Sequence, residues 1–158
     1  MWYLVRCTLR RLASVHEAVG RLGLEAFLPV YDGRPLFPDS FLVRASRQDF
    51  ASLLNSNIPG LMPYSKSADG HDFVSFPDSK INMLRTIVDS MDPNILVDQT
   101  LAPHYLSGDM VEVIDSPFKG VVGRYFKYKG QHRVFVEIPG LGIFGTAYVP
   151  RGMVRMAA

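Results

Sequence analysis

The sequence predicts an α+β fold, in which an N-terminal α/β sandwich with an antiparallel sheet is followed by a small all-β barrel. In residues 1–92, apolar residues at helical spacing are interleaved with short β-rich runs, which is typical of helices packed on a small sheet. After residue 104, short strand candidates are separated by turns that contain proline or glycine. These two patterns indicate two domains of different class.

Each element of the first domain has a local signal. A β-rich alternation predicts a strand over 2–8, and helical spacing predicts a helix over 10–22 that ends at Gly23. The turn signal Asp32-Gly33 separates two further strands. We expect these strands over 24–31 and 36–45.

The remaining elements of this domain are shorter. A short helix is expected over 47–55, and short strands over 61–64 and 73–75 flank a polar loop at 66–72. Pro77 and Asp78 supply the initial proline and the acidic first turn of a last helix. The apolar stripe expected along this helix consists of Ile81, Leu84, Val88 and Met91.

The second domain is expected to contain only strands. Five are predicted, over 110–114, 120–128, 133–138, 143–149 and 153–156. About 50 residues with five strands can close into a small barrel, which removes exposed sheet edges. Such a barrel has a thin core, and we therefore expect a docking module rather than an enzyme.

Charge and glycine content change at the same place. Residues 1–103 hold 10 Lys and Arg against 11 Asp and Glu, a net charge of −1, whereas residues 104–158 hold 7 against 4, a net of +3. Eight of the 13 glycines follow residue 104. We expect a first domain over 1–92, a linker over 93–103 and a second domain over 104–158.

Composition excludes several classes of protein. The chain is 47% hydrophobic, which excludes disorder, and its apolar runs are far shorter than the ~20 residues of a membrane helix. Arginines interrupt the N-terminal region before the apolar part of a signal peptide is complete. The single cysteine, Cys7, forms no internal disulfide, which fits a reducing cytoplasm. We expect a cytoplasmic monomer with no membrane partner.

Signs of catalytic chemistry are weak. The histidines, His16, His71, His104 and His132, lack the spacing of metal ligands, and no glycine-rich phosphate loop exists. Cys7 fits a small core residue better than a nucleophile. We therefore expect no enzyme, no cofactor and no metal, and a binding function instead.

Two segments of the C-terminal half form a known pattern. Residues 108–114, GDMVEVI, and 116–123, SPFKGVVG, resemble the KOW motif. In this pattern, alternating apolar residues fill a small barrel and glycines allow sharp bends at its corners. The resemblance implies an SH3-like all-β KOW barrel.

Upstream segments extend the resemblance to nearly the whole chain. Residues 2–5 (WYLV), 27–30 (FLPV), 34–38 (RPLFP) and 58–61 (IPGL) follow one another as in the N-terminal (NGN) domain of NusG. The chain thus resembles the NusG family of transcription elongation and antitermination factors. The Pro-Leu-Phe-Pro run is similar to that of specialised paralogues, RfaH and the UpxY proteins.

The resemblance implies a polymerase-binding surface on the first domain. NusG-family N-terminal domains bind the β′ clamp helices of RNA polymerase through an apolar depression and lie across the DNA cleft, which would suppress pausing or termination by shifting a conformational population. By motif position, this surface would hold Phe37 and Pro38, with Phe41 and Tyr3 behind them. The alternative is that Phe37 and Phe41 are core residues of a strand.

Two further sites follow from the same resemblance. Arg6, Arg10 and Arg11 would lie near upstream and non-template DNA and contact phosphates, unless they form a solvated helix start. In the KOW domain, Phe144 would be an exposed anchor for a small-subunit ribosomal protein or the Rho factor, unless it lies in the barrel core.

Two other functions compete with this one. The first is a ribosome- or RNA-binding KOW protein, which would be far more basic and would not need the Pro-Leu-Phe-Pro run. The second is a small enzyme with a barrel appendage, which has no residue constellation to support it. We expect a transcription elongation or antitermination factor.

Overall fold

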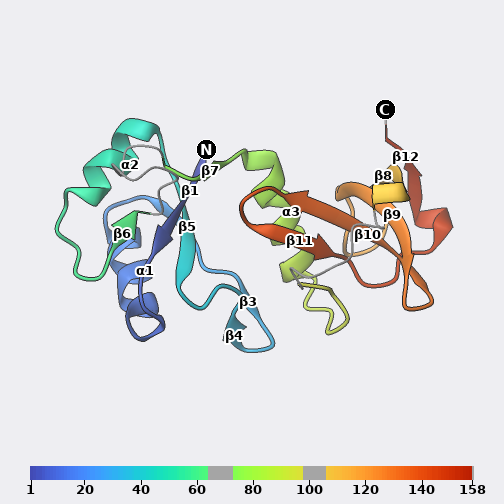
Figure 1. The fold of residues 1–158 in the computed structure, drawn as a ribbon, viewed down its shortest axis with the longest axis horizontal. Helices are drawn as coiled ribbons and strands as arrows, with labels where there is room; N and C mark the ends of the chain where they lie inside the picture. Colours follow the sequence, from blue (N-terminus) through green and yellow to red (C-terminus); the bar gives the residue numbers. More distant parts are fainter. Residues whose placement is uncertain (64–72, 98–105, 158) are drawn as a thin grey trace. The chain divides into compact units, whose positions relative to one another are not determined.

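The computed structural model describes residues 1–63, 73–97 and 106–157 (Figure 1). The chain divides into two compact units, Met1–Asp78 and Ser79–Ala158. Helices and antiparallel sheets combine as the predicted α+β class requires. The domain boundaries expected at residues 92 and 104 stay a prediction, and the polar loop expected at 66–72 lies outside the described residues.

The first unit is built on a five-stranded antiparallel sheet. Its strands are β1 (Trp2–Arg6), β2 (Glu25–Phe27), β5 (Ser40–Arg44), β6 (Met62–Pro63) and β7 (Ser75–Phe76). The order is β2-β5-β1-β6, and β7 also pairs with β1. The first strand therefore lies centrally in the sheet, and in the register Tyr3 faces Val43 and Val5 faces Phe41.

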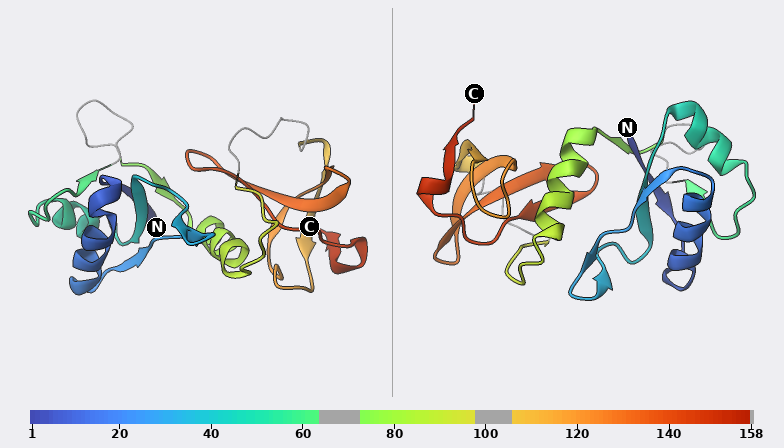
Figure 2. Two further views of the ribbon diagram at one scale, coloured as in Figure 1. Left: turned by 90° about the horizontal axis from the view of Figure 1, so that it is seen from below. Right: turned by 180° about the vertical axis from the view of Figure 1, so that it is seen from behind.

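Two helices cover one face of this sheet. The 3-10 turn η1 (Leu9–Arg11) leads into α1 (Leu12–Arg21), and α2 (Arg47–Leu54) follows β5; both helices can be followed in Figure 2. The core on this face joins Tyr3, Val5, Cys7, Leu12, Val15, Val19, Phe41, Val43, Phe50 and Leu53. Every second residue of β1 and β5 contributes, as the two-residue period of a strand requires.

The expected strands at 24–31 and 36–45 are shorter than the sequence predicts. A separate hairpin of β3 (Val30–Tyr31) and β4 (Arg34–Pro35) turns at Asp32 and Gly33, with φ of 53° and 73°. The turn signal was therefore correct, because positive φ at both central residues is the tight-hairpin geometry that Asp-Gly favours. β5 begins only at Ser40, after Pro38, which has no N–H to donate to a sheet.

The helix α3 (Asp78–Asp89) starts where Pro77 and Asp78 predicted. Its buried residues are Ile81, Leu84, Ile87 and Val88. Met91 was expected on the same stripe, and this is wrong: its side chain is 87% exposed. The helix has ended by then, and Met91 adopts a φ of 55°, which takes it off the helical face.

The second unit contains the five expected strands in one antiparallel sheet. They are β8 (Asp109–Val113), β9 (Val122–Tyr128), β10 (Gln131–Ile138), β11 (Gly142–Gly145) and β12 (Val154–Met156), in the order β11-β10-β9-β8-β12. One face carries residues that are at most 3% exposed, namely Val111, Val113, Val134, Val136 and Phe144. This all-β core is that of a small barrel, as the sequence predicted.

Part of the expected linker pairs with β11 at the edge of this sheet. Leu96 and Gly145 exchange two backbone hydrogen bonds, of 2.8 and 2.7 Å, and Ile95 is buried. Arg133 is buried here as well; its Nη1 donates to the backbone oxygens of Asn94 and Thr146. Residues 94–96 are thus held against the sheet, whereas residues 98–103 lie outside the described part of the chain.

Among the described residues, no helix is long and apolar enough to cross a membrane.

Candidate interaction surface

Residues predicted to bind polymerase and residues predicted to bind nucleic acid meet at one end of the first sheet. Arg6, the last residue of β1, faces Ser40 in β5 and Met62 in β6. One residue further, the N–H of Cys7 donates to the backbone oxygen of Asp39 at 2.9 Å. The segment of Pro38 therefore lies beside the end of β1, although 32 positions separate Pro38 from Arg6.

The chain then exposes a mixed basic and apolar surface. After β1, η1 carries Leu9, Arg10 and Arg11, all of them exposed, and Leu9 is 60% exposed. Met62 is 48% exposed, and Pro38 is exposed as well. We call this set the β1-end surface: Arg6, Leu9, Arg10, Arg11, Pro38 and Met62.

The arginines of the β1-end surface precede the N-terminus of α1, where the helix dipole disfavours positive charge. The helix α1 begins directly after them, with no acidic residue in its first turn and no side-chain cap at Arg11. Cations at a helix N-terminus are unfavourable because the peptide dipoles give that end a partial positive charge. Such an arrangement lowers stability unless a bound anion compensates it, which favours a contact with phosphate or acidic groups.

The two η1 arginines also differ from others in the same unit. Arg21 pairs with Glu17 at 2.6 Å, and Arg44 pairs with Asp78 at 2.8 Å. Within residues 1–63 and 73–97, no carboxylate forms an ion pair with Arg10 or Arg11. Their charge is therefore available to an external anion.

Packing against a glycine positions the Arg11 side chain. A Cβ on Gly60 would lie 2.7 Å from Cδ of Arg11, and Gly60 has a φ of +87°. The absence of a side chain at Gly60 thus gives the aliphatic stem of Arg11 room to lie across the 58–61 turn. Arg11 as a whole stays exposed.

The other predicted polymerase-binding residues lie mostly in the interior. Phe37 is only 7% exposed. Phe41 is fully buried, with its ring 5.5 Å from that of His16 in an edge-to-face contact, and Tyr3 stacks on Phe50 at 4.4 Å. For Phe41 the alternative of a core residue in a strand is correct, and Tyr3 is a core residue as well, because both occupy strand positions that face α1 and α2.

The prediction that Phe144 is an exposed anchor is wrong. Phe144 is 1% exposed and lies opposite Val136, itself a core residue. The glycine beside Phe144 serves close packing rather than exposure of the ring. A Cβ on Gly145 would lie 2.9 Å from the Phe135 ring of β10, so only glycine lets β11 lie this close to that ring. Phe144 therefore fills the core of the barrel.

Cys7 is a core residue, as expected. Its side chain is 2% exposed, and burial together with the nearby carboxylate of Asp39 raises the pKa of the thiol. A reactive cysteine needs the opposite environment, which stabilises the thiolate. Cys7 is thus unsuited to nucleophilic chemistry.

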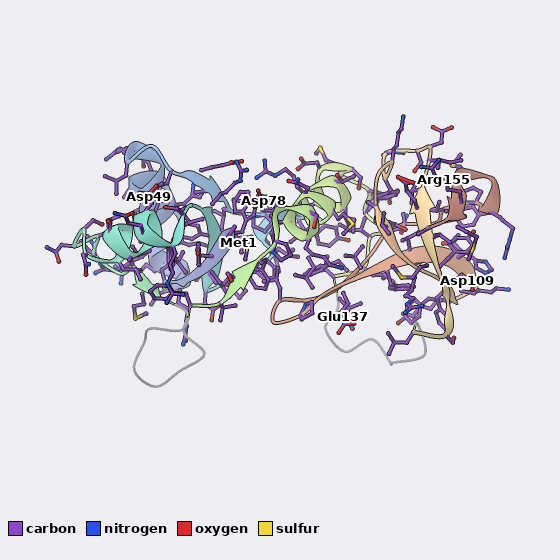
Figure 3. All side chains as sticks on the ribbon, turned by 90° about the horizontal axis from the view of Figure 1, so that it is seen from above. Met1, Asp49, Asp78, Asp109, Glu137 and Arg155 are labelled. Carbon is purple, nitrogen blue, oxygen red and sulfur yellow. The ribbon has the colours of Figure 1, made fainter. Side chains whose placement is uncertain are left out.

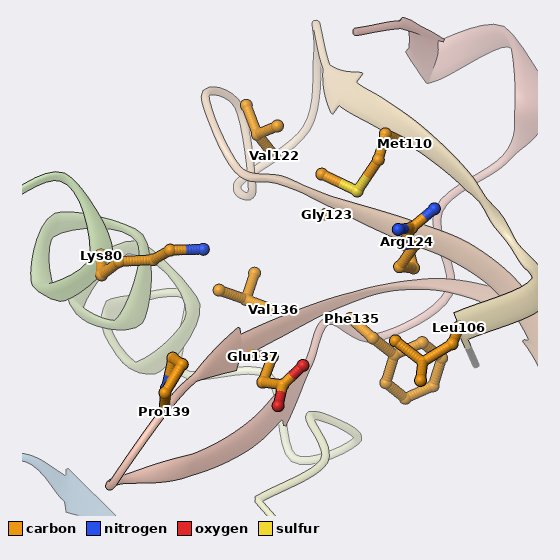
Figure 4. Close-up of a pocket in the computed structure, with 10 residues that line it drawn as sticks. All are labelled: Lys80, Leu106, Met110, Val122, Gly123, Arg124, Phe135, Val136, Glu137 and Pro139. Atoms are coloured by element: carbon orange, nitrogen blue, oxygen red, sulfur yellow. The ribbon is translucent and has the colours of Figure 1, made fainter. Parts of the chain in front are cut away.

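The second unit holds a cavity of about 280 Å³ between α3 and the sheet (Figure 4). Its charged lining residues are Lys80, Arg124 and Glu137, and Lys80 extends from α3 toward the strands. The remaining lining is mostly apolar, with no histidine, cysteine or hydroxyl side chain among the residues that form it. Nor do the described residues include a group of three or more His, Cys, Asp and Glu that could hold a metal ion.

Sequence reasoning missed Leu9 and Met62 as surface residues. Both are apolar residues in or beside predicted elements, and such residues are usually buried. The position of Met62 depends on the pairing of β6 with the last residue of β1, which no local pattern encodes.

Comparison with solved structures identifies the fold. A structure of NusG from Thermotoga maritima matches with a TM-score of 0.52 and 20% sequence identity, over 99% of this chain and 97% of that chain. A structure of the MjSpt4:Spt5 complex matches at 18% identity over 100% and 99% of the two chains, but its TM-score of 0.34 is too low to carry an argument. No family model matches the sequence, and no curated protein matches it.

Proposed function

We propose that this protein is a transcription elongation and antitermination factor, a specialised member of the NusG family resembling RfaH or UpxY. It acts in the cytoplasm as a monomer and not as an enzyme: residues 1–92 bind the β′ clamp helices of RNA polymerase, residues 93–103 form a linker, and residues 104–158 form a KOW domain. The observation that carries the proposal is the NusG fold over 99% of the chain, together with the ordered NusG-like motifs in the sequence.

The β1-end surface is the proposed contact with polymerase. Pro38 and Met62 are exposed apolar groups, and Phe37 supports Pro38 from a nearly buried position. Exposed apolar side chains beside cations suit the tip of a coiled coil, whose apolar seam is flanked by charged residues. Phe41 and Tyr3 contribute indirectly, by holding the strands that carry this surface.

The arginines extend the contact to nucleic acid. Arg6, Arg10 and Arg11 border the apolar groups on the same surface. When the apolar groups of this surface contact polymerase, the arginines would meet the phosphates of nearby non-template DNA. Arginine–phosphate contacts add affinity that falls as the salt concentration rises. Binding across the cleft in this way would hinder opening of the clamp and so suppress pausing or termination.

The KOW domain is proposed to couple the complex to a small-subunit ribosomal protein or to Rho. Since Phe144 lies in the core, that contact would use exposed residues of the barrel, with Phe144 maintaining its shape.

Retention of purified RNA polymerase on the immobilised full-length protein tests the function. Pro38→Glu and Met62→Glu place a charge on the proposed apolar contact, and we expect each to weaken binding by about tenfold or more. Leu22→Glu is the matched control, because Leu22 is an exposed apolar residue of the same unit that lies after the far end of α1.

Two results would contradict the proposal. Failure of the wild-type protein to bind polymerase would reject the function. Equal binding by the wild type and both glutamate variants would reject the surface while leaving the function intact. Pause lifetimes measured with and without the protein provide the functional readout.

A further inference from the structure

Three strands of the barrel sheet line a cavity with the face that points away from the barrel core. Met110 on β8, Arg124 on β9 and Phe135 on β10 are direct neighbours in the register. Val122 and Glu137 lie two positions further along β9 and β10, and in a strand every second residue shares a face. These residues form the floor of the cavity of about 280 Å³.

The helix α3 supplies the opposite wall of this cavity. Lys80 extends from the first turn of α3 toward the strands, as Figure 4 shows. One turn further along, Met83 Sδ accepts a hydrogen bond from the N–H of Val122 at 3.2 Å. This contact joins α3 to a residue that itself lines the cavity, so both walls are in place before any ligand binds.

Lys80 differs from the other lysines that the structure describes in this unit. It is half-buried, whereas Lys119, Lys127 and Lys129 are exposed. Within residues 1–63, 73–97 and 106–157, no carboxylate forms an ion pair with Lys80. Partial burial of an ammonium group costs free energy unless an anion or hydrogen bonds replace the lost water. The cavity therefore holds a cation that a bound anion would stabilise.

A second cation lines the same cavity. Arg124 is half-buried, and its Nη1 donates to the backbone oxygen of Gly108 at 3.1 Å, which orients the guanidinium. This hydrogen bond uses only part of the guanidinium, which carries several further N–H donors. All the uncharged residues of the lining are apolar. Apolar walls with a few charged groups that fix orientation are typical of small-molecule sites.

The size and charge of the cavity restrict its ligand. Its volume is just below the ~300–1,000 Å³ of most small-molecule sites, which suits a compact ligand. The carboxylate of Glu137 belongs to the same lining and would repel a second negative charge, which disfavours a phosphate dianion or a dicarboxylate. Two cations, one carboxylate and apolar walls together suit a single negative charge on an apolar body.

We infer that this cavity binds a small amphipathic monocarboxylate. The ligand carboxylate pairs with Lys80 in a charge-assisted contact, and Arg124 adds positive potential. The apolar chain of the ligand lies on Met110, Val122 and Phe135 and gains free energy by leaving water. The site lies within the second unit and does not use the β1-end surface, so its failure would leave the proposed function intact.

Chemical-shift titration of the isotope-labelled full-length protein with sodium octanoate tests the inference. Lys80→Gln removes the charge and keeps most of the length of the side chain. Lys119→Gln is the matched control, because Lys119 is an exposed lysine of the same unit that does not line the cavity. Octanol, which has the chain without the charge, and inorganic phosphate, which has the charge without the chain, are titrated separately.

Octanoate is expected to shift the amides of residues 122–124 and 135–137, which line the cavity. Lys80→Gln should raise the dissociation constant of octanoate by about tenfold, the size of one charge-assisted hydrogen bond, and Lys119→Gln by less than about twofold. Hexanoate should bind the wild type about tenfold more weakly than octanoate, because it buries two fewer CH2 groups. Octanol and phosphate should each bind more weakly than octanoate.

A second variant tests the opposite wall. Met110→Glu adds a negative charge to the lining at a residue that is 38% exposed, so the barrel should tolerate it. We expect this variant to weaken octanoate binding at least as much as Lys80→Gln, through repulsion of the carboxylate. The amide spectrum of each variant without ligand shows whether the protein is folded.

Four results would overturn the inference. The first is the absence of saturable shifts when octanoate is added to the wild type, and the second is an unchanged dissociation constant in both Lys80→Gln and Met110→Glu. The third is octanol or phosphate binding as tightly as octanoate, which would mean that charge and chain are not recognised together. The fourth is an equal shift at Leu22, an exposed apolar residue of the first unit, which would identify unspecific adsorption of the chain.

Discussion

Asp78 Oδ2 accepts hydrogen bonds from both Nε and Nη2 of Arg44, at 3.1 and 2.8 Å. The N-terminal ammonium of Met1 lies 3.2 Å from Oδ1 of the same carboxylate, and Met1 and Asp78 are labelled in Figure 3. The hydrogen bonds from Arg44, followed by that from the N-terminus, lower the pKa of Asp78. One carboxylate thus connects the start of the chain, the end of β5 and the first turn of α3.

The first prediction concerns the pH dependence of stability. Because the folded-state pKa of Asp78 lies below the unfolded value of about 3.9, its contribution is fully present above that value and is lost as pH falls through the folded-state pKa. We expect Asp78→Asn to lower the free energy of unfolding at pH 7, with a difference from wild type that shrinks below about pH 4. Urea unfolding at several pH values measures it.

Asp89→Asn is the matched control for this prediction. Asp89 lies at the other end of α3 and is exposed, and it forms no ion pair with the described residues. A difference between Asp78→Asn and wild type that stays constant from pH 7 to pH 2 would contradict the role of the ionised carboxylate.

The second prediction concerns Gly123 in β9. A Cβ at this position would lie 2.2 Å from the backbone oxygen of Phe135, a contact that the sheet cannot relieve without moving a strand. We expect Gly123→Ala to destabilise the protein by about 1–3 kcal/mol, the range of overpacking effects. Gly152→Ala is the control, since nothing lies within 4 Å of its added Cβ, and chemical denaturation should show a change within about 0.5 kcal/mol.

The third prediction separates packing from binding at Phe144. Because the ring is buried, Phe144→Ala should destabilise the protein by about 3–5 kcal/mol through loss of apolar burial and creation of a cavity. Tyr148→Ala, at an exposed aromatic position, should change stability far less. Thermal unfolding measures both. Equal stability of the wild type and Phe144→Ala would restore the idea of an exposed anchor.

The fourth prediction concerns the single thiol. Burial, followed by the charge of Asp39, raises the pKa of Cys7, and its side chain is 2% exposed. Alkylation by iodoacetamide at pH 8 should therefore be slow in the folded protein and rapid in denaturant, because only the accessible thiolate reacts. Mass spectrometry of timed samples gives the two rates, and similar rates would contradict the placement of Cys7 in the core.

Most local structure was predictable from the sequence. The helical spacing that ends at Gly23, the Asp32-Gly33 turn and the five C-terminal strands all appear close to the expected positions. These features depend on interactions between residues a few positions apart, so short windows contain the information. Met91 is one exception, because the apolar spacing continues for one turn after the backbone has left the helix.

The candidate site was predictable only in part. Pro38, Arg6, Arg10 and Arg11 are exposed, and the pairing of β1 with β5 brings Pro38 beside the arginines. Tyr3 and Phe41 were expected behind the contact surface and Phe144 as an exposed anchor, and all three are buried. An aromatic residue in a strand has the same local pattern whether it faces the core or a partner. The register of the sheet, which is a property of distant segments, decides between the two.

The sequence by itself determined the fold class, the order of most elements and the absence of a recognisable catalytic motif. Only the tertiary structure decided which face of each strand is buried, which apolar residues remain exposed at the end of β1, and that Lys80, Arg124 and Glu137 line one cavity. The physical reason is the range of the interactions: helical spacing and turns act over a few residues, whereas strand pairing sets contacts between segments that lie far apart in the chain.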